Sequence, residues 1–369
     1  MEIDNKISHS QVALLAYGSA MGNIVYTFPQ SAQISGSAFW VATFLGVLIN
    51  VPFAIWILFL GSYKRDGTLF DLLEAGLGKT ICKFVIVVYF FLNVAVTMGM
   101  LNMFAGAIKA FFLPRTPAFV IISLIVLMCA IFANSGLKYF VRFIAILPVL
   151  AMANYFIGFS LSFFKDFKIE NVIPVFDTTF PLFIKSMLFT AGNTAESLFI
   201  FMILVEYIPQ TAKHYLAVIK GYFAWAVILA VAIMIMEGIV SQELISGVSA
   251  AGITVSSIIL VSRFLSGLEI FILFTYQYFV VLKTAITLYC CWTSAKKLFG
   301  VSNGKPLLII SALTVFASSS WLNSFNKGYF FSIFLGNYVI VPFVVIVLFL
   351  CSVSAWIVRS RGRDRNMAK

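Results

Sequence analysis

The longest apolar runs of this chain limit its possible folds more than any other feature. Segments 84–100 and 343–356 contain no Asp, Glu, Lys or Arg, and charged residues make up only 11% of the sequence. A soluble domain typically carries about a quarter, so only lipid suits such an exterior. In lipid the backbone must satisfy its own hydrogen bonds, as helices and closed barrels do. Barrel strands alternate in polarity, whereas these runs are continuous. The sequence therefore predicts an all-α membrane protein.

About ten transmembrane helices are expected, in a single transmembrane domain over residues 1–369. Each helix needs about 20 apolar residues to cross the hydrocarbon. The spans form two halves, repeat one at about 9–165 and repeat two at about 181–358, with a basic tail at 359–369. The expected spans are 11–33, 39–62, 83–112, 117–136, 139–164, 181–207, 215–240, 258–292, 306–322 and 338–358.

Basic residues predict the orientation of these spans. Of the 25 Lys and Arg residues, seventeen fall on the side of the N-terminus, six fall on the other side, and Arg263 and Lys283 lie within the eighth span. Loops rich in Lys and Arg face the cytoplasm, so both termini are expected there. The net charge of +11 then requires no nucleic-acid partner. A basic tail directly after a span is more typical of a topology signal that contacts anionic membrane lipid.

Two polar patches rich in small residues lie inside the first and sixth spans. Asn and Thr are costly against lipid, and Gly lowers helix propensity. Each patch lies in the first span of its half of the chain, and this pattern is typical of an inverted five-plus-five repeat with broken helices one and six. Alternatively, Gly18 and Gly22, four apart, form a packing face of small residues. The candidate ligand-binding residues are Gly18, Ser19, Met21, Gly22 and Asn23 in the first span and Thr190, Gly192, Asn193, Thr194 and Glu196 in the sixth.

A broken helix creates binding chemistry, because amides and carbonyls at the break lose their intrahelical partners. They offer donors to an anionic group and acceptors to an ammonium or a cation. Glu196, at the inner edge of its patch, could receive a ligand ammonium, bind a proton or cap the inner half-helix. Thr97 shares a helix face with Asn93 and could line the site or bond to a neighbouring helix.

The eighth span carries two further charges, Glu269 and Lys283, which an ideal helix projects from nearly the same face. Against lipid each would cost roughly 2.5–3.5 kcal/mol, so both are expected to face the bundle interior. Lys283 could act as a fixed cation or a proton-accepting amine, or it could extend to the cytoplasmic interface. Glu269 is expected to form a structural ion pair rather than a ligand contact.

No arrangement of residues suggests catalysis or metal binding. The two histidines, His9 and His214, lie at membrane edges, and the five cysteines lack the spacing of a metal site. No glycine-rich phosphate loop is present. We therefore expect no enzyme activity, no cofactor and no metal site.

Three segments carry a resemblance to a known family. Residues 196–209 begin with Glu196, residues 264–274 contain Glu269, and residues 279–283 end with Lys283. Together with Lys6 and Pro29, they resemble the sixth helix, the eighth helix and the opening of the spore germination permease family. This family belongs to the amino acid/polyamine/organocation transporter superfamily.

Two positions depart from the family pattern. The family often has Gly-x-Gly in the first break, where this chain has Gly22-Asn23-Ile24, and often has Gly before the sixth-helix acid, where this chain has Ala195. Bulkier residues narrow the space for a ligand, so the nutrient could differ from a typical one.

The resemblance implies a fold of the leucine-transporter type and a role as the B subunit of a germinant receptor in the spore inner membrane. Such a subunit senses a small-molecule nutrient, with an amino acid expected, beside an A subunit and a lipoprotein C subunit. An alternative is a proton-coupled amino acid symporter in which Lys283 or Glu196 titrates. A third reading is a scaffold of spans that binds no ligand.

Overall fold

The computed structural model describes residues 6–21, 24–64, 67–173, 175–248, 269–301, 304–322 and 325–367. These residues form helices joined by short loops and contain no strand. Within them, seven helical runs are long and apolar enough to cross a membrane, and two shorter apolar helices accompany them. The prediction of an all-α, multi-pass membrane protein is confirmed.

Most expected spans coincide with one helix each. The eighth span is described from residue 269 onward, so its expected beginning at 258 lies outside the described residues. These helices are α3 (Phe39–Gly61), α5 (Lys79–Phe111), α6 (Ala118–Asn134), α7 (Leu137–Asp166), α10 (Ala212–Ile239), α13 (Glu269–Phe299) and α14 (Lys305–Leu322).

The first span is divided into two helices, α1 (His9–Ala20) and α2 (Ile24–Ser35). Ser8 begins α1 with a capping box, in which its hydroxyl accepts from the amide of Gln11 and its own amide donates to the Gln11 side chain. Helix α1 ends where Met21 turns to an extended conformation (φ −64°, ψ 143°). The predicted interruption of the first span is therefore present.

The sixth span remains helical throughout but tightens in its middle. It consists of α8 (Phe180–Thr194), the 3₁₀ turn η3 (Ala195–Ser197), α9 (Leu198–Leu204) and the 3₁₀ turn η4 (Val205–Tyr207). Thr194 donates to the carbonyl of Thr190, and Asn193 donates to the carbonyl of Phe189. These polar side chains thus bond within their own helix, and the helix tightens into a 3₁₀ turn at the patch instead of unwinding.

The tenth span begins earlier than expected. Helix α15 (Phe325–Phe334) continues through the π-helical turn η5 (Leu335–Ile340) into α16 (Val341–Met367), whereas the sequence placed the start of this span at residue 338. Gly336 and Asn337 precede the expected start, and the π-helical turn accommodates them inside a continuous helix.

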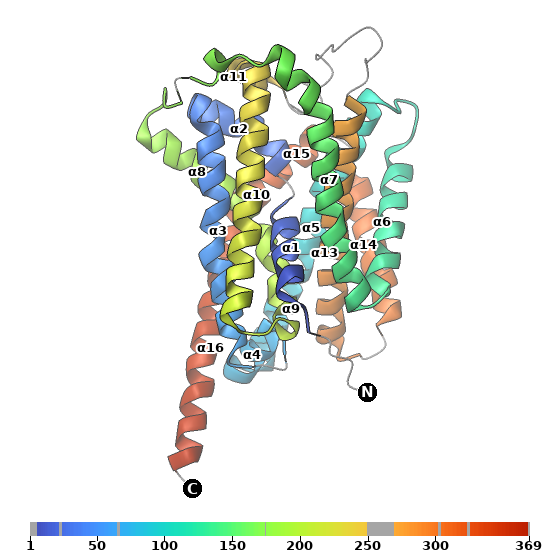
Figure 1. Ribbon diagram of the computed structural model, residues 1–369. Helices are drawn as coiled ribbons and strands as arrows, with labels where there is room; N and C mark the ends of the chain where they lie inside the picture. Colours follow the sequence, from blue (N-terminus) through green and yellow to red (C-terminus); the bar gives the residue numbers. More distant parts are fainter. Residues whose placement is uncertain are drawn as a thin grey trace.

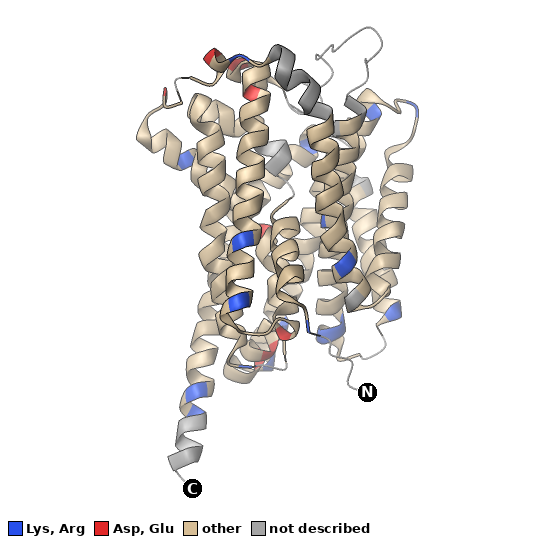
Figure 2. Ribbon diagram, viewed as in Figure 1, with Lys and Arg blue, Asp and Glu red and all other residues tan. Residues whose placement is uncertain are grey.

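The helices stand side by side in one bundle (Figure 1). Helix α1 packs against α10 and α7, and α13 packs against α5 and α7. Charged residues gather mainly toward the two ends, and most of the ribbon between them is uncharged (Figure 2). Helix α1 begins, and α16 ends, at the same end of the bundle, as an even number of crossings requires.

A short amphipathic helix, α4 (Leu69–Leu77), covers that same end between α3 and α5. Asp71 of α4 forms an ion pair with Lys297 of α13, and its carboxylate accepts from the amide and hydroxyl of Thr68. Burial raises the pKa of Asp71, but the hydrogen bonds from Lys297 and Thr68 and the charge of Lys297 outweigh burial, so its pKa lies below the usual value.

Candidate functional site

A buried ion pair joins three helical segments at the centre of the bundle. Lys283 of α13 lies 2.8 Å from Oε1 of Glu196 on η3, and the two side chains are 1% and 2% exposed. The same ammonium donates to the carbonyl of Ser19, near the end of α1, over 3.1 Å. Lys283 therefore links the broken first span to the 3₁₀ turn of the sixth.

The position of the ammonium follows from the break in the first span. The last carbonyls of a helix have no intrahelical partner and carry partial negative charge. The carbonyl of Ser19 lies in this last turn, so a cation is stabilised there, and Glu196 supplies the compensating charge. Lys283 does not extend to the membrane interface, which was one of the two alternatives from the sequence.

Polar side chains extend from the ion pair to the neighbouring helices. The hydroxyls of Thr97 and Thr287 lie 2.5 Å apart, and Thr287 also donates to the carbonyl of Lys283. On the other side, the hydroxyls of Ser197 and Tyr222 lie 2.6 Å apart. Thr97 of α5 thus bonds to α13, and its partner Thr287 in turn donates to the carbonyl of Lys283.

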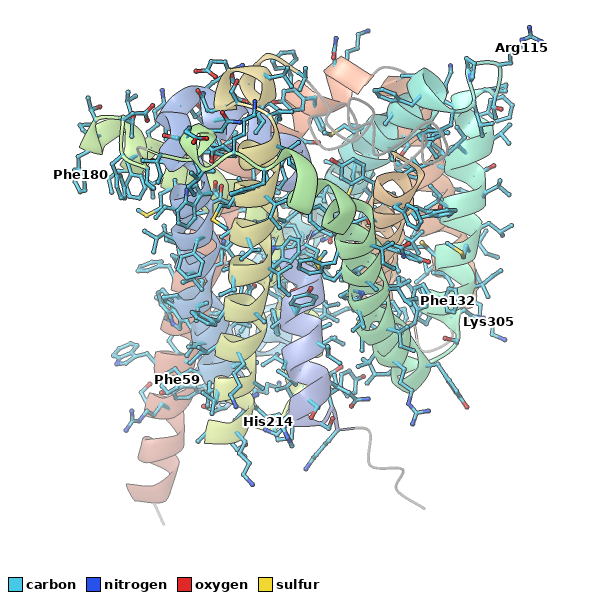
Figure 3. All side chains as sticks on the ribbon, turned by 45° about the horizontal axis from the view of Figure 1, so that its top comes forward. Phe59, Arg115, Phe132, Phe180, His214 and Lys305 are labelled. Carbon is cyan, nitrogen blue, oxygen red and sulfur yellow. The ribbon has the colours of Figure 1, made fainter. Side chains whose placement is uncertain are left out.

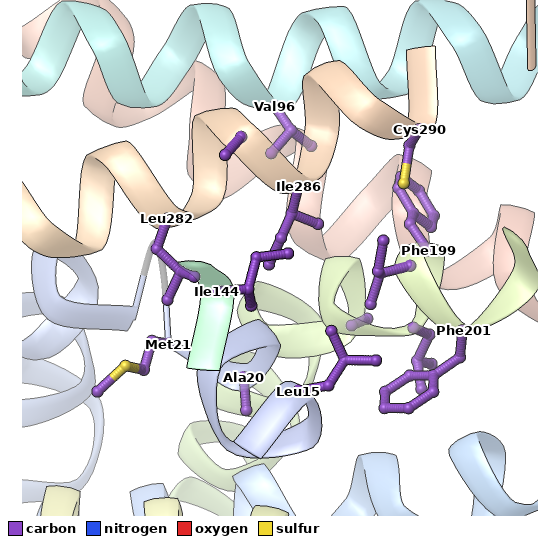
Figure 4. Close-up of a cluster of buried hydrophobic side chains, with 14 of the residues drawn as sticks. Leu15, Ala20, Met21, Val96, Ile144, Phe199, Phe201, Leu282, Ile286 and Cys290 are labelled. Carbon is purple, nitrogen blue, oxygen red and sulfur yellow. The ribbon is translucent and has the colours of Figure 1, made fainter. Parts of the chain in front are cut away.

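Apolar side chains surround the end of α1. Figure 4 shows Leu15, Ala20 and Met21 of the first span close to Leu282 of α13 and Phe199 of α9. All of them are buried. The surroundings of the ion pair on the α1 side are thus closely packed rather than open.

Gly18 takes part in this packing. A Cβ atom added to it would lie 2.9 Å from the side chain of Pro148 and 3.3 Å from that of Leu282. This close approach to α7 and α13 agrees with the small-residue packing alternative for Gly18.

A large cavity lies on the other side of the sixth span. This partly open cavity of about 1020 Å³ is bounded by α2, α3, α8, η5 and α16 and reaches Gly192, Ala195 and Leu198 at the turn. Two of the helices that line it, α2 and α8, lie in the half of the bundle opposite α4 and the end of α16 (Figure 1). Figure 3 shows Phe180, the first residue of α8, at the outer edge of the molecule, where it is 75% exposed.

Two Gly–Asn pairs, Gly192–Asn193 and Gly336–Asn337, pack α8 against η5 beside this cavity. A Cβ atom on Gly336 would lie 3.0 Å from Oδ1 and 3.2 Å from Cα of Asn193, and a Cβ atom on Gly192 would meet Asn337. The backbones of α8 and η5 approach closely because both glycines lack side chains. Oδ1 of Asn193 is buried with no hydrogen-bond partner among the described residues.

The structure thus divides the candidate residues into two groups. Ser19, Glu196 and Lys283 meet at the ion pair, Thr97 bonds to Thr287 one turn along α13, and Met21 packs at the end of α1. Thr190, Gly192, Asn193 and Thr194 face α3 and η5; Thr190, for example, packs against Gly46 of α3. Gly22, Asn23 and the side chain of Glu269 lie outside the described residues.

Sequence reasoning missed several residues of the cavity wall. Asn50 of α3 donates to Thr194 Oγ1 over 2.8 Å and to the carbonyl of Ala191 over 3.1 Å. Gln30 and Asn337 also line the cavity. One signal was available for Asn337, because Gly336–Asn337 repeats the Gly–Asn pairs at 22–23 and 192–193.

Comparisons with solved structures establish the fold. A Na⁺-coupled sialic acid symporter in a substrate-bound outward-open state is 14% identical with a TM-score of 0.64, and the match covers 96% of this chain and 88% of that one. The nucleobase-cation-symport-1 family transporter MHP1, with bromovinylhydantoin bound, is 13% identical with a TM-score of 0.64, covering 86% and 72%. A manganese transporter of Eremococcus coleocola is 14% identical with a TM-score of 0.64, covering 92% and 78%.

These neighbours are transporters, so the transporter-type fold expected from the family resemblance is confirmed. A search of curated protein sequences finds no match. The model of one protein family, described as spore germination protein, matches residues 6–327. The chain is a member of the spore germination protein family.

Proposed function

We propose that this chain is the nutrient-sensing subunit of a spore germinant receptor, a B subunit that works beside an A subunit and a lipoprotein C subunit. In this proposal it resides in the spore inner membrane with both termini on the cytoplasmic side, where its basic tail contacts anionic lipid. A small nutrient binds beside the tightened turn of the sixth span. Binding shifts an equilibrium between two arrangements of the bundle, and the partner subunits respond to the shift.

The single observation that supports this proposal best is the contact between the cavity and the ion pair. Ala195 lines the cavity, and the next residue, Glu196, holds Lys283. A solute that displaces η3 therefore changes the distance between Glu196 and Lys283, and with it the link to Ser19. A ligand shifts an equilibrium between two protein conformations only if it binds one of them more tightly. A solute in contact with η3 would meet this condition if the two conformations differ in the position of η3.

Spores that carry charge-removing variants test the proposal. In Glu196→Gln and Lys283→Met, we expect loss of ion release in response to a panel of L-alanine, D-glucose and inosine. The double variant removes both charges together, so it keeps the protein folded, as an immunoblot of the inner membrane would verify. The matched control is Lys297→Met, which removes the cation of the more exposed pair with Asp71. Normal ion release from the double variant would refute the proposal.

A second candidate, a proton-coupled symporter, is favoured by one observation. Helix ends and unwound carbonyls hold the coupling cation in many transporters, and here the ammonium of Lys283 occupies such a position. A symporter would use Lys283 or Glu196 to carry a proton. Saturable uptake into liposomes by the purified chain, driven by a pH gradient and abolished by Lys283→Met, would favour this function. Ion release that depends on A and C subunits, without such uptake, would favour the receptor.

A further inference from the structure

The chemistry of the cavity lining narrows the class of solute that it accepts. Three carboxamide side chains reach it from three different elements: Gln30 of α2, Asn50 of α3 and Asn337 of η5. Both N–H groups of Asn50 are used, because they donate to the carbonyl of Ala191 and to Thr194, and one N–H group of Asn337 donates to the carbonyl of Ile333. The remaining carboxamide oxygens are hydrogen-bond acceptors.

At least one of these acceptors has no hydrogen-bond partner. Oε1 of Gln30 is buried, and none of the described residues donates to it. A buried polar group without a partner costs free energy unless a ligand or water supplies the missing hydrogen bond. The side-chain oxygen of Gln30, one of the residues that line the cavity, therefore lacks a hydrogen-bond donor.

Formal charge is nearly absent from the same surface. No Asp or Glu is found among the described residues that line the cavity, and the single charged one is Lys185, which is exposed on α8. The nearest buried acid in sequence, Glu196, already pairs with Lys283. An ammonium group in this apolar surrounding would have no carboxylate to compensate its desolvation.

The rest of the lining is apolar. Ile49, Phe53, Leu198 and Val344 present carbon surface between the carboxamides. Apolar walls with a few fixed hydrogen-bonding groups suit a ring that carries hydroxyls on its edge and C–H groups on its faces. An acyl chain of a lipid would fill the space but would leave the carboxamide oxygens unpaired.

We infer that the cavity binds an uncharged, hydroxyl-bearing solute of the size of a sugar, a cyclitol or a nucleoside, rather than a zwitterionic amino acid. Hydroxyls both donate and accept, so they satisfy the carboxamide oxygens without bringing charge into the membrane. The volume of about 1020 Å³ lies just above the usual range of about 300–1,000 Å³ for small-molecule pockets. This inference rests on the proposed function, because it assigns the solute class for the same site.

The test measures binding to the purified chain in lipid nanodiscs by calorimetry. The probes are D-glucose, myo-inositol and inosine on one side and L-alanine, L-valine and L-proline on the other. We expect saturable binding of at least one hydroxylated probe. Asn337→Leu should weaken it about three- to tenfold, the value of one neutral hydrogen bond. The matched control is Asn154→Leu, because Asn154 also donates only to its own helix, to the carbonyl of Leu150, and lies outside the cavity.

Each remaining outcome decides the question. Binding of an amino acid that Asn337→Leu weakens, or failure of all three hydroxylated probes at millimolar concentration, would overturn the inference. A phospholipid that copurifies with the wild type and is lost in Asn337→Leu would also overturn it. If a hydroxylated probe binds in the cavity yet triggers no ion release in spores, the solute class stands and the sensing role fails. If an amino acid triggers release through the cavity, the sensing role stands and the solute class fails.

Discussion

Removal of the Lys283 ammonium is the most direct test of the central ion pair. In Lys283→Met the apolar stem remains, but Glu196 stays buried opposite a methyl group, and the carbonyl of Ser19 loses its donor. Breaking a buried pair by removing one partner costs about 3–5 kcal/mol, because the remaining charge stays buried without its opposite charge. We therefore expect a loss of this size in the free energy of unfolding of Lys283→Met.

The double variant Glu196→Gln/Lys283→Met should be more stable than Lys283→Met alone. It replaces both charges with neutral side chains of similar size, and such replacements are often close to neutral. The difference between the double variant and the sum of the two single variants should then be at least about 2 kcal/mol, as expected for residues in direct contact.

Unfolding in mixed micelles with increasing SDS, followed by tryptophan fluorescence, provides the assay. The chain has six tryptophans, and the buried Trp225 packs against Tyr17 of α1 and Phe279 of α13. Lys297→Met is the matched control, because the Lys297 and Asp71 side chains are 17% and 32% exposed. Such an exposed pair contributes about 0–1 kcal/mol. Equal losses in Lys283→Met and Lys297→Met, or strictly additive effects in the double variant, would refute the reasoning.

Two further perturbations test other parts of the structure. Gly336→Ala should destabilise the protein by about 1–3 kcal/mol, because its Cβ would lie 3.0 Å from Asn193, whereas Gly247→Ala meets nothing within 4 Å and should change little; equal unfolding midpoints would contradict the close contact. The depressed pKa of Asp71 means that its pair with Lys297 contributes stability above the pKa of the unfolded state and loses it as pH falls through the folded value. The difference in unfolding free energy between wild type and Asp71→Asn should therefore be constant above about pH 5 and vanish in stronger acid.

The membrane fold was predictable because its causes are local in the sequence. Long apolar runs require helices in lipid, and the patch around Met21 interrupts the first span as expected. The patch in the sixth span was recognised, but its conformation was not, because Asn193 and Thr194 donate to carbonyls of their own helix. Whether such side chains permit unwinding depends on their rotamers, which no sequence pattern specifies.

The candidate site was only partly predictable, because it depends on contacts between distant segments. Lys283 and Glu196 were each singled out as costly charges, yet their pairing follows from how α13 packs against the sixth span. The cavity wall at Asn337 was missed, because a Gly–Asn pair near a span end is typical of a loop. A π-helical turn absorbs this pair without ending the helix, and the expected boundary was therefore too late.

The unbroken course of α16 gives the cavity a mechanical connection to the opposite end of the bundle. Asn337 lines the cavity, and Arg361, further along the same helical run, donates to the carbonyl of Ala75 on α4 over 3.4 Å. At 1.5 Å per residue the two positions are about 36 Å apart. A rod of this length converts a tilt of about 5° at one end into a displacement of about 3 Å at the other. Under the proposed function, a solute that tilts this helix at the cavity would therefore displace its other end relative to α4.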